Sequence, residues 1–170
     1  MLSGSLESVE AVADVSVILP VCFQNPLKKL AVEFIREALM LEKKIVLPIT
    51  AILGAYHIAT RYIKASRHDV KKILVELLQT RSPALYPHIN VDVAVDSLDI
   101  ASIYNIESWD GYIISLAKTL GAKTIFTLDK KMRKAAGIKA EAPFPNHAVK
   151  EYHKYIKSIT ARSRKTNKTK

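Results

Sequence analysis

The sequence predicts an α/β protein built as a three-layer sandwich, with a central parallel sheet flanked by helices. The first observation behind this prediction is a series of short apolar segments suited to buried strands, at residues 9–14, 45–48 and 122–128. The second is that stretches with apolar residues at helical spacing separate these segments. Strands joined by helices pack in parallel, and the helices then cover both faces of the sheet.

The first apolar segment, Val9–Val21, has two interpretations. It is one buried strand, or it is a strand to about Asp14 followed by a helical turn that Ser16 caps. A proline inside a central strand removes a hydrogen bond between strands, and Pro20 lies in this segment. We therefore expect the strand to end at Asp14.

Capping residues indicate where several helices begin and end. Asn25 and Pro26 suit the start of one helix, and Thr50 opens the next. Ser108 caps a later helix that Gly121 stops. The expected helices cover residues 25–44, 51–64, 67–80, 94–105, 108–121 and about 147–160, with a turn or short helix at 129–137 and an irregular stretch or short strand at 82–91.

The length and the distribution of charge bound the domain organisation. A chain of 170 residues suits one domain with a single core, and we expect that domain to cover residues 1–150. The formal net charge is +10, and residues 150–170 hold eight Lys/Arg against one Glu. We expect residues 151–170 to form a basic helix end and a flexible tail. This tail either attracts a polyanion such as RNA or is a solvated end that keeps the protein soluble.

Composition also indicates the compartment. Cys22 is the one cysteine of the chain, so no internal disulfide forms, as expected in a reducing cytoplasm. No apolar run has the roughly 18–20 residues that span a bilayer. The N-terminus is acidic where a secretion signal is basic. We therefore expect a cytoplasmic protein without membrane segments.

Three aspartates are expected to meet at one edge of the sheet. Asp14 ends the first strand, and Asp129 follows the strand at residues 122–128. Asp110 begins a helix of about ten residues, roughly 15 Å long, and the strand after Gly121 returns by about 20 Å. The two lengths nearly cancel, so Asp110 and Asp129 reach the same edge. Each acid also has a simpler interpretation as a helix cap or a turn residue.

Carboxylates gathered in this way favour a divalent cation. Like charges raise one another's pKa, and a cation at their centre removes that cost. Oxygen ligands suit Mg²⁺ or Mn²⁺, and either ion assists hydrolysis of a phosphodiester. The hydroxyls of Ser16 and Thr127 lie two residues from proposed ligands and could orient the carboxylates.

Three motifs carry a resemblance to a known family. "DVSVIL" contains Asp14 and Ser16, "SWDGYIISLA" contains Asp110, and "TIFTLD" contains Thr127 and Asp129. In this order, over about residues 9–140, they resemble the PIN-domain family of Mg²⁺- or Mn²⁺-dependent ribonucleases, which includes the VapC-type toxins of toxin–antitoxin pairs. The resemblance implies an RNA substrate, an antitoxin partner and a homodimer. It also implies that the three aspartates are the catalytic and metal-binding residues.

One position departs from the family pattern. Family members usually carry a glutamate on the second helix, and Gly54 stands at that position here. Glu107, one helical turn before Asp110, either replaces it or is a solvated residue near the helix start. His57 is expected to be a surface or core histidine rather than a ligand.

Three functions are consistent with these observations. The first is a metal-dependent endoribonuclease whose RNA backbone is held by the tail and by Lys130, Lys131, Arg133 and Lys134. The second is a PIN-like module that binds RNA with weakened or no cleavage, as Gly54 suggests. The third is an interaction domain in which the acids serve only as caps.

Overall fold

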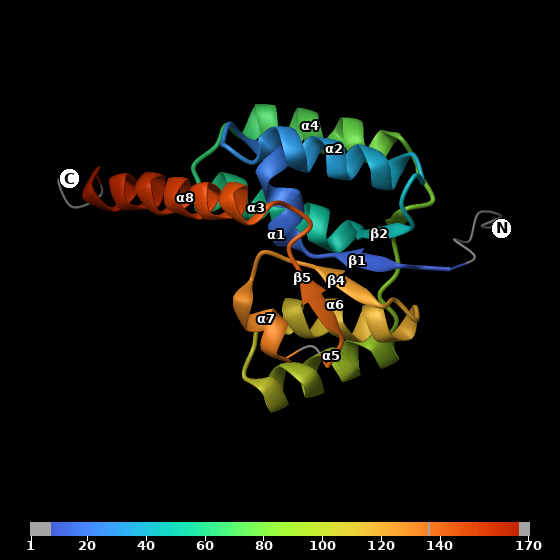
Figure 1. Cartoon of the computed structure of the whole chain (residues 1–170). Helices are drawn as coiled ribbons and strands as arrows, with labels where there is room; N and C mark the ends of the chain where they lie inside the picture. The colour runs from blue at the N-terminus through green and yellow to red at the C-terminus, as the bar shows by residue number, and fades with distance from the viewer. Residues whose placement is uncertain (1–7, 136, 167–170) are drawn as a thin grey trace.

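The computed structural model describes residues 8–135 and 137–166 and contains a parallel sheet flanked by helices (Figure 1). Within these residues the five strands run in the order β3-β2-β1-β4-β5, and all pairings are parallel. The strands are β1 (Ala11–Ala13), β2 (Ile45–Pro48), β3 (Leu85–Tyr86), β4 (Thr124–Phe126) and β5 (Lys139–Glu141). The helices are α1 (Val15–Ile18), the 3₁₀ turn η1 (Leu19–Cys22), α2 (Lys28–Leu39), α3 (Ile49–Arg61), α4 (Arg67–Gln79), α5 (Val91–Tyr104), α6 (Ser108–Thr119), α7 (Lys130–Ala135) and α8 (Asn146–Thr166). The predicted three-layer α/β fold is confirmed.

Alternate residues of the central strands face two separate cores. Ala11 and Ala13 point into a core shared with α1, α2, α3, α4 and the start of α8. Val12 and Ile125 point into a second core shared with α5 and α6. Figure 1 shows α2, α3 and α4 above the sheet and α5 and α6 below it. The sheet therefore separates α8 from α5.

Close packing of α5 on α6 fixes the beginning of α6. A Cβ atom at Gly111 would lie 2.2 Å from the carbonyl oxygen of Ser97, so only glycine fits at this position. Asp110 is the neighbour of Gly111 and is thereby held at the edge of the sheet. At the other end of the helix, Gly121 has a φ of +66° and stops the helix as predicted.

Several predicted caps are wrong. Asp14, not Ser16, caps α1, because its carboxylate accepts the backbone N–H of Ser16. Thr50 does not open α3, which begins at Ile49 with Pro48 as the preceding residue. Ser108 is the first residue of α6 rather than its cap. Adjacent polar residues offer alternative caps, and the backbone geometry decides between them.

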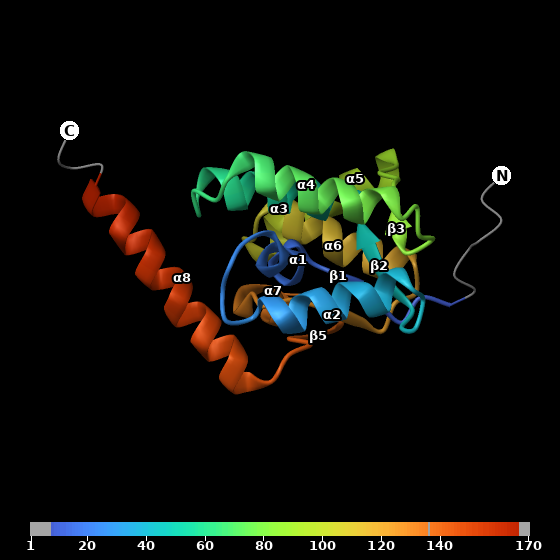
Figure 2. The same ribbon diagram turned by 90° about the horizontal axis from the view of Figure 1, so that it is seen from above.

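Several elements differ from their expected extent, among them α2, which spans Lys28–Leu39 rather than residues 25–44. The short strand β5 was not predicted, because Lys139–Glu141 is polar and lies at the edge of the sheet. The last helix was expected to end near residue 160, whereas α8 continues to Thr166 and projects from the body (Figures 1 and 2). Residues 167–170 of the expected tail lie outside the described part of the chain. Among the described residues, no helix is both long and apolar enough to cross a membrane.

Candidate acidic site

Asp14 lies at the carboxyl end of β1 and is almost fully buried, with 3% of its surface exposed. Its Oδ2 atom accepts hydrogen bonds from the Ser16 hydroxyl at 2.7 Å, the Ser16 backbone N–H at 3.3 Å and the Thr127 hydroxyl at 3.0 Å. Burial raises the pKa of the Asp14 carboxyl, and these hydrogen bonds partly oppose that rise. The side chain is thus held in one orientation at the edge of the sheet.

The two hydroxyls connect Asp14 to the strand beside it. Strands β1 and β4 pair in parallel, with Ala13 opposite Phe126, so the residues that follow each strand are neighbours. The Ser16 Oγ accepts the backbone N–H of Leu128 at 2.8 Å. The Thr127 Oγ1 accepts the backbone N–H of Asp129 at 3.0 Å. Each hydroxyl therefore accepts from the β4 end and donates to Asp14, as expected of groups that orient a ligand.

Asp129 caps α7 as well as bordering the site. Its Oδ1 accepts the backbone N–H of Lys131 at 2.7 Å, which is the capping interpretation that the sequence left open. The same contact fixes the position of the Asp129 side chain beside the β4 end. A capping role and a place in an acidic cluster are therefore compatible.

Asp110 shows that the acids act on one another. Burial, followed by the charges of Asp14, Asp129 and Glu107, raises the pKa of Asp110 to about 7, while Lys131 opposes the rise. A carboxyl group with this pKa is half protonated near neutral pH in the metal-free protein. The structure thus places the three predicted aspartates, together with Glu107, where their charges interact.

The acids do not form a ready-made ligand set. In the part of the chain that the structure describes, no three histidine, cysteine, aspartate or glutamate side chains are arranged to hold a metal ion. Mutual repulsion keeps carboxylates apart without a cation, and Asp129 is also engaged as a cap. The donor chemistry nevertheless suits Mg²⁺ or Mn²⁺, because oxygen ligands and excess negative charge are what these ions require. Asp14, Asp110 and Asp129 are the residues that would hold such an ion.

Gly54 lies directly against the site. A Cβ atom at Gly54 would lie 3.3 Å from the Cγ2 of Val15, the residue that follows Asp14. A side chain at position 54 would therefore begin in tight contact with Val15, which would have to shift slightly to admit it. The sequence identified the missing acid at Gly54 but not this contact, because residues 15 and 54 meet only in the folded chain. His57 lies exposed on α3 with its ring 5.7 Å from that of Tyr62, as expected of a surface histidine.

Basic residues border the acids on one side. Lys130 and Lys131 begin α7 and are exposed. The side chains of Arg133 and Lys134, also expected to contact RNA, lie outside the described part of the structure.

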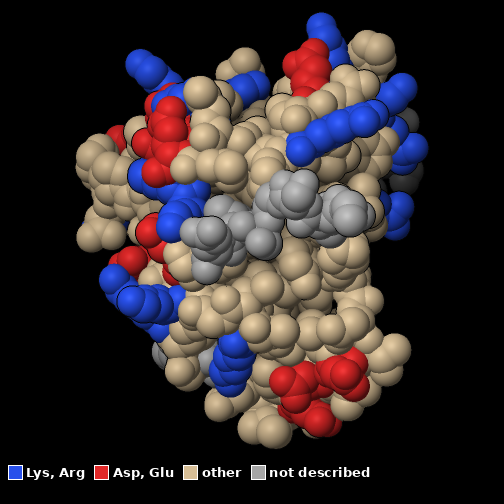
Figure 3. Space-filling view, turned by 90° about the vertical axis from the view of Figure 1, so that its right-hand side faces the viewer, with Lys and Arg blue, Asp and Glu red and all other residues tan. Residues whose placement is uncertain are grey.

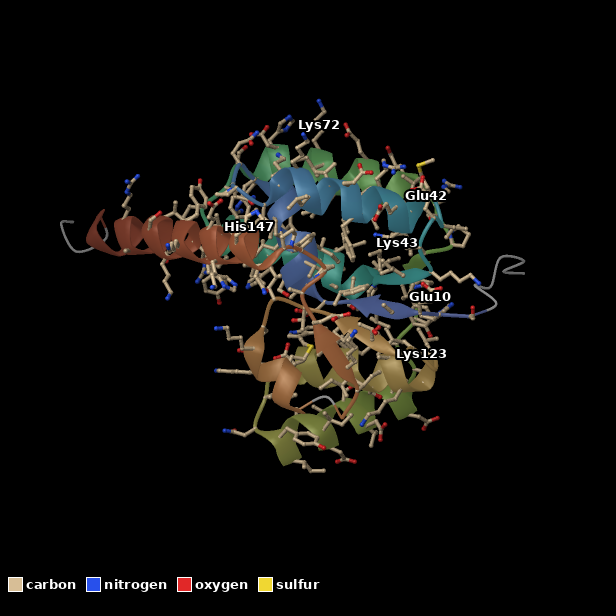
Figure 4. The ribbon with its side chains drawn as sticks, in the orientation of Figure 1. Glu10, Glu42, Lys43, Lys72, Lys123 and His147 are labelled. Carbon is tan, nitrogen blue, oxygen red and sulfur yellow. The ribbon has the colours of Figure 1, made fainter. Side chains whose placement is uncertain are left out.

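Figure 4 shows Glu10, Lys43 and Lys123 gathered at the amino edge of the sheet, at the opposite end from the acidic site. A small cavity lined by Glu10 and Lys43 lies at that far edge and not beside the aspartates.

The fold and the position of the acids indicate which class of protein this is. In parallel α/β sheets the active site typically lies beyond the carboxyl ends of neighbouring strands, where the carboxylates lie here. The sequence model of the PIN-domain family matches residues 11–138, and the chain belongs to that family. Members of this family are generally nucleases, which supports a nuclease-type function here.

Comparison with solved structures shows a shared fold. The crystal structure of PAE2754 from Pyrobaculum aerophilum is similar, with a TM-score of 0.58 and 12% sequence identity. The match covers 94% of this chain and 94% of that chain. At this identity the likeness shows a shared fold. No curated protein matches the sequence.

Proposed function

We propose that the protein is a divalent-metal-dependent endoribonuclease that hydrolyses RNA phosphodiester bonds. Two observations at the carboxyl edge of the sheet carry this proposal. Thr127 donates a hydrogen bond to Asp14 and accepts one from the backbone of Asp129, and the charges of Asp14 and Asp129 help to raise the pKa of Asp110. A group of carboxylates that raise one another's pKa is costly unless a cation offsets their charge. Membership of the PIN-domain family supports the same chemistry.

Asp14 and Asp110 have distinct parts in this proposal. When bound, Mg²⁺ or Mn²⁺ supplies a Lewis acid that offsets the charge developing on the scissile phosphate. Ser16 and Thr127 hold the carboxylate of Asp14 in one orientation, which is the role of groups that orient a metal ligand. Asp110 loses its proton near neutral pH, which makes its carboxylate available to a cation.

The RNA backbone is held by basic residues around the acidic cluster. Lys130 and Lys131 are exposed immediately after Asp129. Further lysines on α8, among them Lys150, Lys154 and Lys157, are exposed and add a basic surface. Contacts of lysine with phosphates release counterions, so binding of RNA is expected to weaken steeply as salt rises.

The test is cleavage of a structured RNA in Mn²⁺ by the wild type and by Asp110→Asn. The variant is expected to lose activity, because it removes a proposed ligand while keeping the size of the side chain. Asp99→Asn is the matched control, since Asp99 is an exposed acid on α5. Cleavage that survives both Asp110→Asn and excess EDTA would refute the proposal.

A toxin role and an antitoxin partner complete the proposal, together with a cytoplasmic location. They rest on the resemblance to VapC-type toxins. An apolar groove of about 340 Å³ between α2 and α4 offers a surface for a partner protein. Its apolar lining includes Val32, Ile35, Leu39, Met40, Ile73 and Leu77. Co-expression with a candidate antitoxin should suppress the cleavage measured above.

A second candidate is a module that binds RNA without cleaving it, and the contact of Val15 with Gly54 favours it. This candidate predicts RNA affinity that is unaffected by Asp110→Asn. A restored acid provides a sharper test. Gly54→Glu combined with Val15→Ala should raise cleavage above the wild type if the missing glutamate limits catalysis. Val15→Ala alone is the control, because it opens the same space without adding a charge.

A further inference from the structure

Trp109 is the one tryptophan of the chain, and it lies next to the acidic site in the sequence, immediately before Asp110. Its side chain is 61% exposed. Single apolar side chains on a protein surface are common and need no explanation by themselves. The place of Trp109 on α6 is different, because the same side of this helix is buried one turn further on.

Trp109 lies on the side of α6 that faces the sheet. Residues three and four positions apart share one face of a helix, and on this face Trp109 is followed by Tyr112 and Ile113. Those two side chains are 4% and 3% exposed and belong to the core shared with β1 and β4. Trp109 is one turn nearer the start of α6, and side chains on a helix lean toward its start. Its ring therefore lies beyond the carboxyl edge of the sheet, where no strand covers it.

The acids separate Trp109 from the lysines of α7. The Tyr112 hydroxyl donates to the carbonyl oxygen of His88 at 3.3 Å, so this side of α6 is turned toward the end of β3. Trp109 shares that side. Lys130 and Lys131 follow β4, which lies beyond β1 from β3 in the sheet. An elongated ligand that crosses the acids therefore meets positive charge on one side and an aromatic ring on the other.

The α5 end of the molecule repels RNA. Figure 3 views the protein from the amino ends of the strands, and acidic side chains gather at its lower edge, where Figure 1 places α5. Asp92, Asp96 and Asp99 are exposed on this helix. Carboxylates and phosphates repel one another, so an RNA strand is expected to approach from the carboxyl edge, where Trp109 lies.

We propose that Trp109 stacks on an unpaired base of the RNA at the acidic site and thereby positions the strand across the carboxylates. The identity of this ligand rests on the proposed ribonuclease function. Unpaired bases of RNA stack on aromatic side chains, and every base offers a flat face for this contact. A protein partner bound over Trp109 would also cover Asp110, whereas a substrate base leaves the acids free to act.

The test begins with the fluorescence of Trp109, which reports on this one position because the chain has no other tryptophan. The full chain is titrated in EDTA, where no metal is bound, with a short single-stranded RNA and with a duplex of the same sequence. The single strand is expected to quench the fluorescence. The duplex should not, because its bases are already stacked on one another.

The affinity for labelled RNA, measured by anisotropy, tests the contribution of the ring. Trp109→Leu should weaken binding of the single strand at least about fivefold, while Trp109→Phe keeps a ring and should retain most of the affinity. An RNA whose central nucleotides lack bases should bind Trp109→Leu and the wild type equally. Tyr62→Leu is the matched control, since Tyr62 is an exposed aromatic residue at the far end of α3.

Each alternative result overturns the proposal. Fluorescence that single-stranded RNA leaves unchanged would place the RNA elsewhere, and wild-type affinity in Trp109→Leu would leave Trp109 as a docking point for protein. Equal losses in Trp109→Leu and Trp109→Phe would exclude stacking. Circular dichroism melting confirms that each variant is folded. Quenching without metal-dependent cleavage would remove the nuclease and keep the stacking contact, and cleavage without quenching would do the reverse.

Discussion

Asp110→Asn should stabilise the metal-free protein at neutral and higher pH, and the gain should disappear in acid. A pKa of about 7 against an ordinary value of 3.8 corresponds to about 4 kcal/mol if the carboxyl were fully buried. Since Asp110 is partly exposed, screening by water reduces this to about 1–2 kcal/mol. Asparagine resembles the protonated acid, so the variant avoids the cost of the buried charge.

The direction in which stability changes with pH follows from proton binding. The folded state of the wild type holds the Asp110 proton more tightly than the unfolded chain does. The stability from this group is therefore complete below about pH 4 and is lost as the pH rises through about 7. The difference between variant and wild type should grow over this interval and then level off.

Urea unfolding in EDTA, from about pH 4 to pH 8, measures this difference. Asp99→Asn is the control for removing one acidic side chain from the chain. If the free energies of unfolding of Asp110→Asn and wild type stay parallel over the whole range, the reasoning about the buried cluster is refuted. Added Mn²⁺ should reverse the order at pH 8, because only the wild type keeps the full set of proposed ligands.

Two further pairs of substitutions test how the site is held. Thr127→Val should lower the free energy of unfolding by about 2 kcal/mol, because it removes a hydrogen bond to buried Asp14 and leaves a backbone N–H without its acceptor. Thr127→Ser keeps the hydroxyl and should retain most of the stability. Equal losses of stability for the two variants in thermal melts would contradict this reasoning. Gly111→Ala should lower the free energy of unfolding by about 3 kcal/mol, because its Cβ would overlap the backbone of α5. Gly121→Ala should lower it by about 1 kcal/mol, because this position lies in open space but has a positive φ. A smaller loss for Gly111→Ala than for Gly121→Ala would show that the α5–α6 contact yields easily.

The sequence predicted the fold because its strongest signals are local. Apolar strands and amphipathic helices alternate, and parallel strands then bring their carboxyl ends to one edge. From that rule Asp14 and Asp129, which are far apart in the chain, are predicted to lie at the same edge of the sheet. The lengths of α6 and β4 predict that Asp110 lies at this edge as well.

Features that depend on tertiary contacts were not predictable. The strand β5 is polar and pairs at an edge, so no apolar pattern marks it. The cap of α1 is Asp14 rather than Ser16, because two capping residues two positions apart are distinguished only by backbone angles. The packing of Val15 against Gly54 joins α1 to α3, which are far apart in the chain. A glycine in place of an expected acid was visible in the sequence, whereas the close approach of Val15 to that glycine was not.

The most direct test of the account is a calorimetric titration of Mn²⁺ into the metal-free protein. The wild type is expected to bind about one ion per chain, with an affinity that rises with pH as Asp110 loses its proton. Asp14→Asn and Asp110→Asn should each abolish this binding. A wild type that gives no heat of binding, or variants that bind Mn²⁺ as tightly as the wild type, would contradict the assignment of these carboxylates to a metal site.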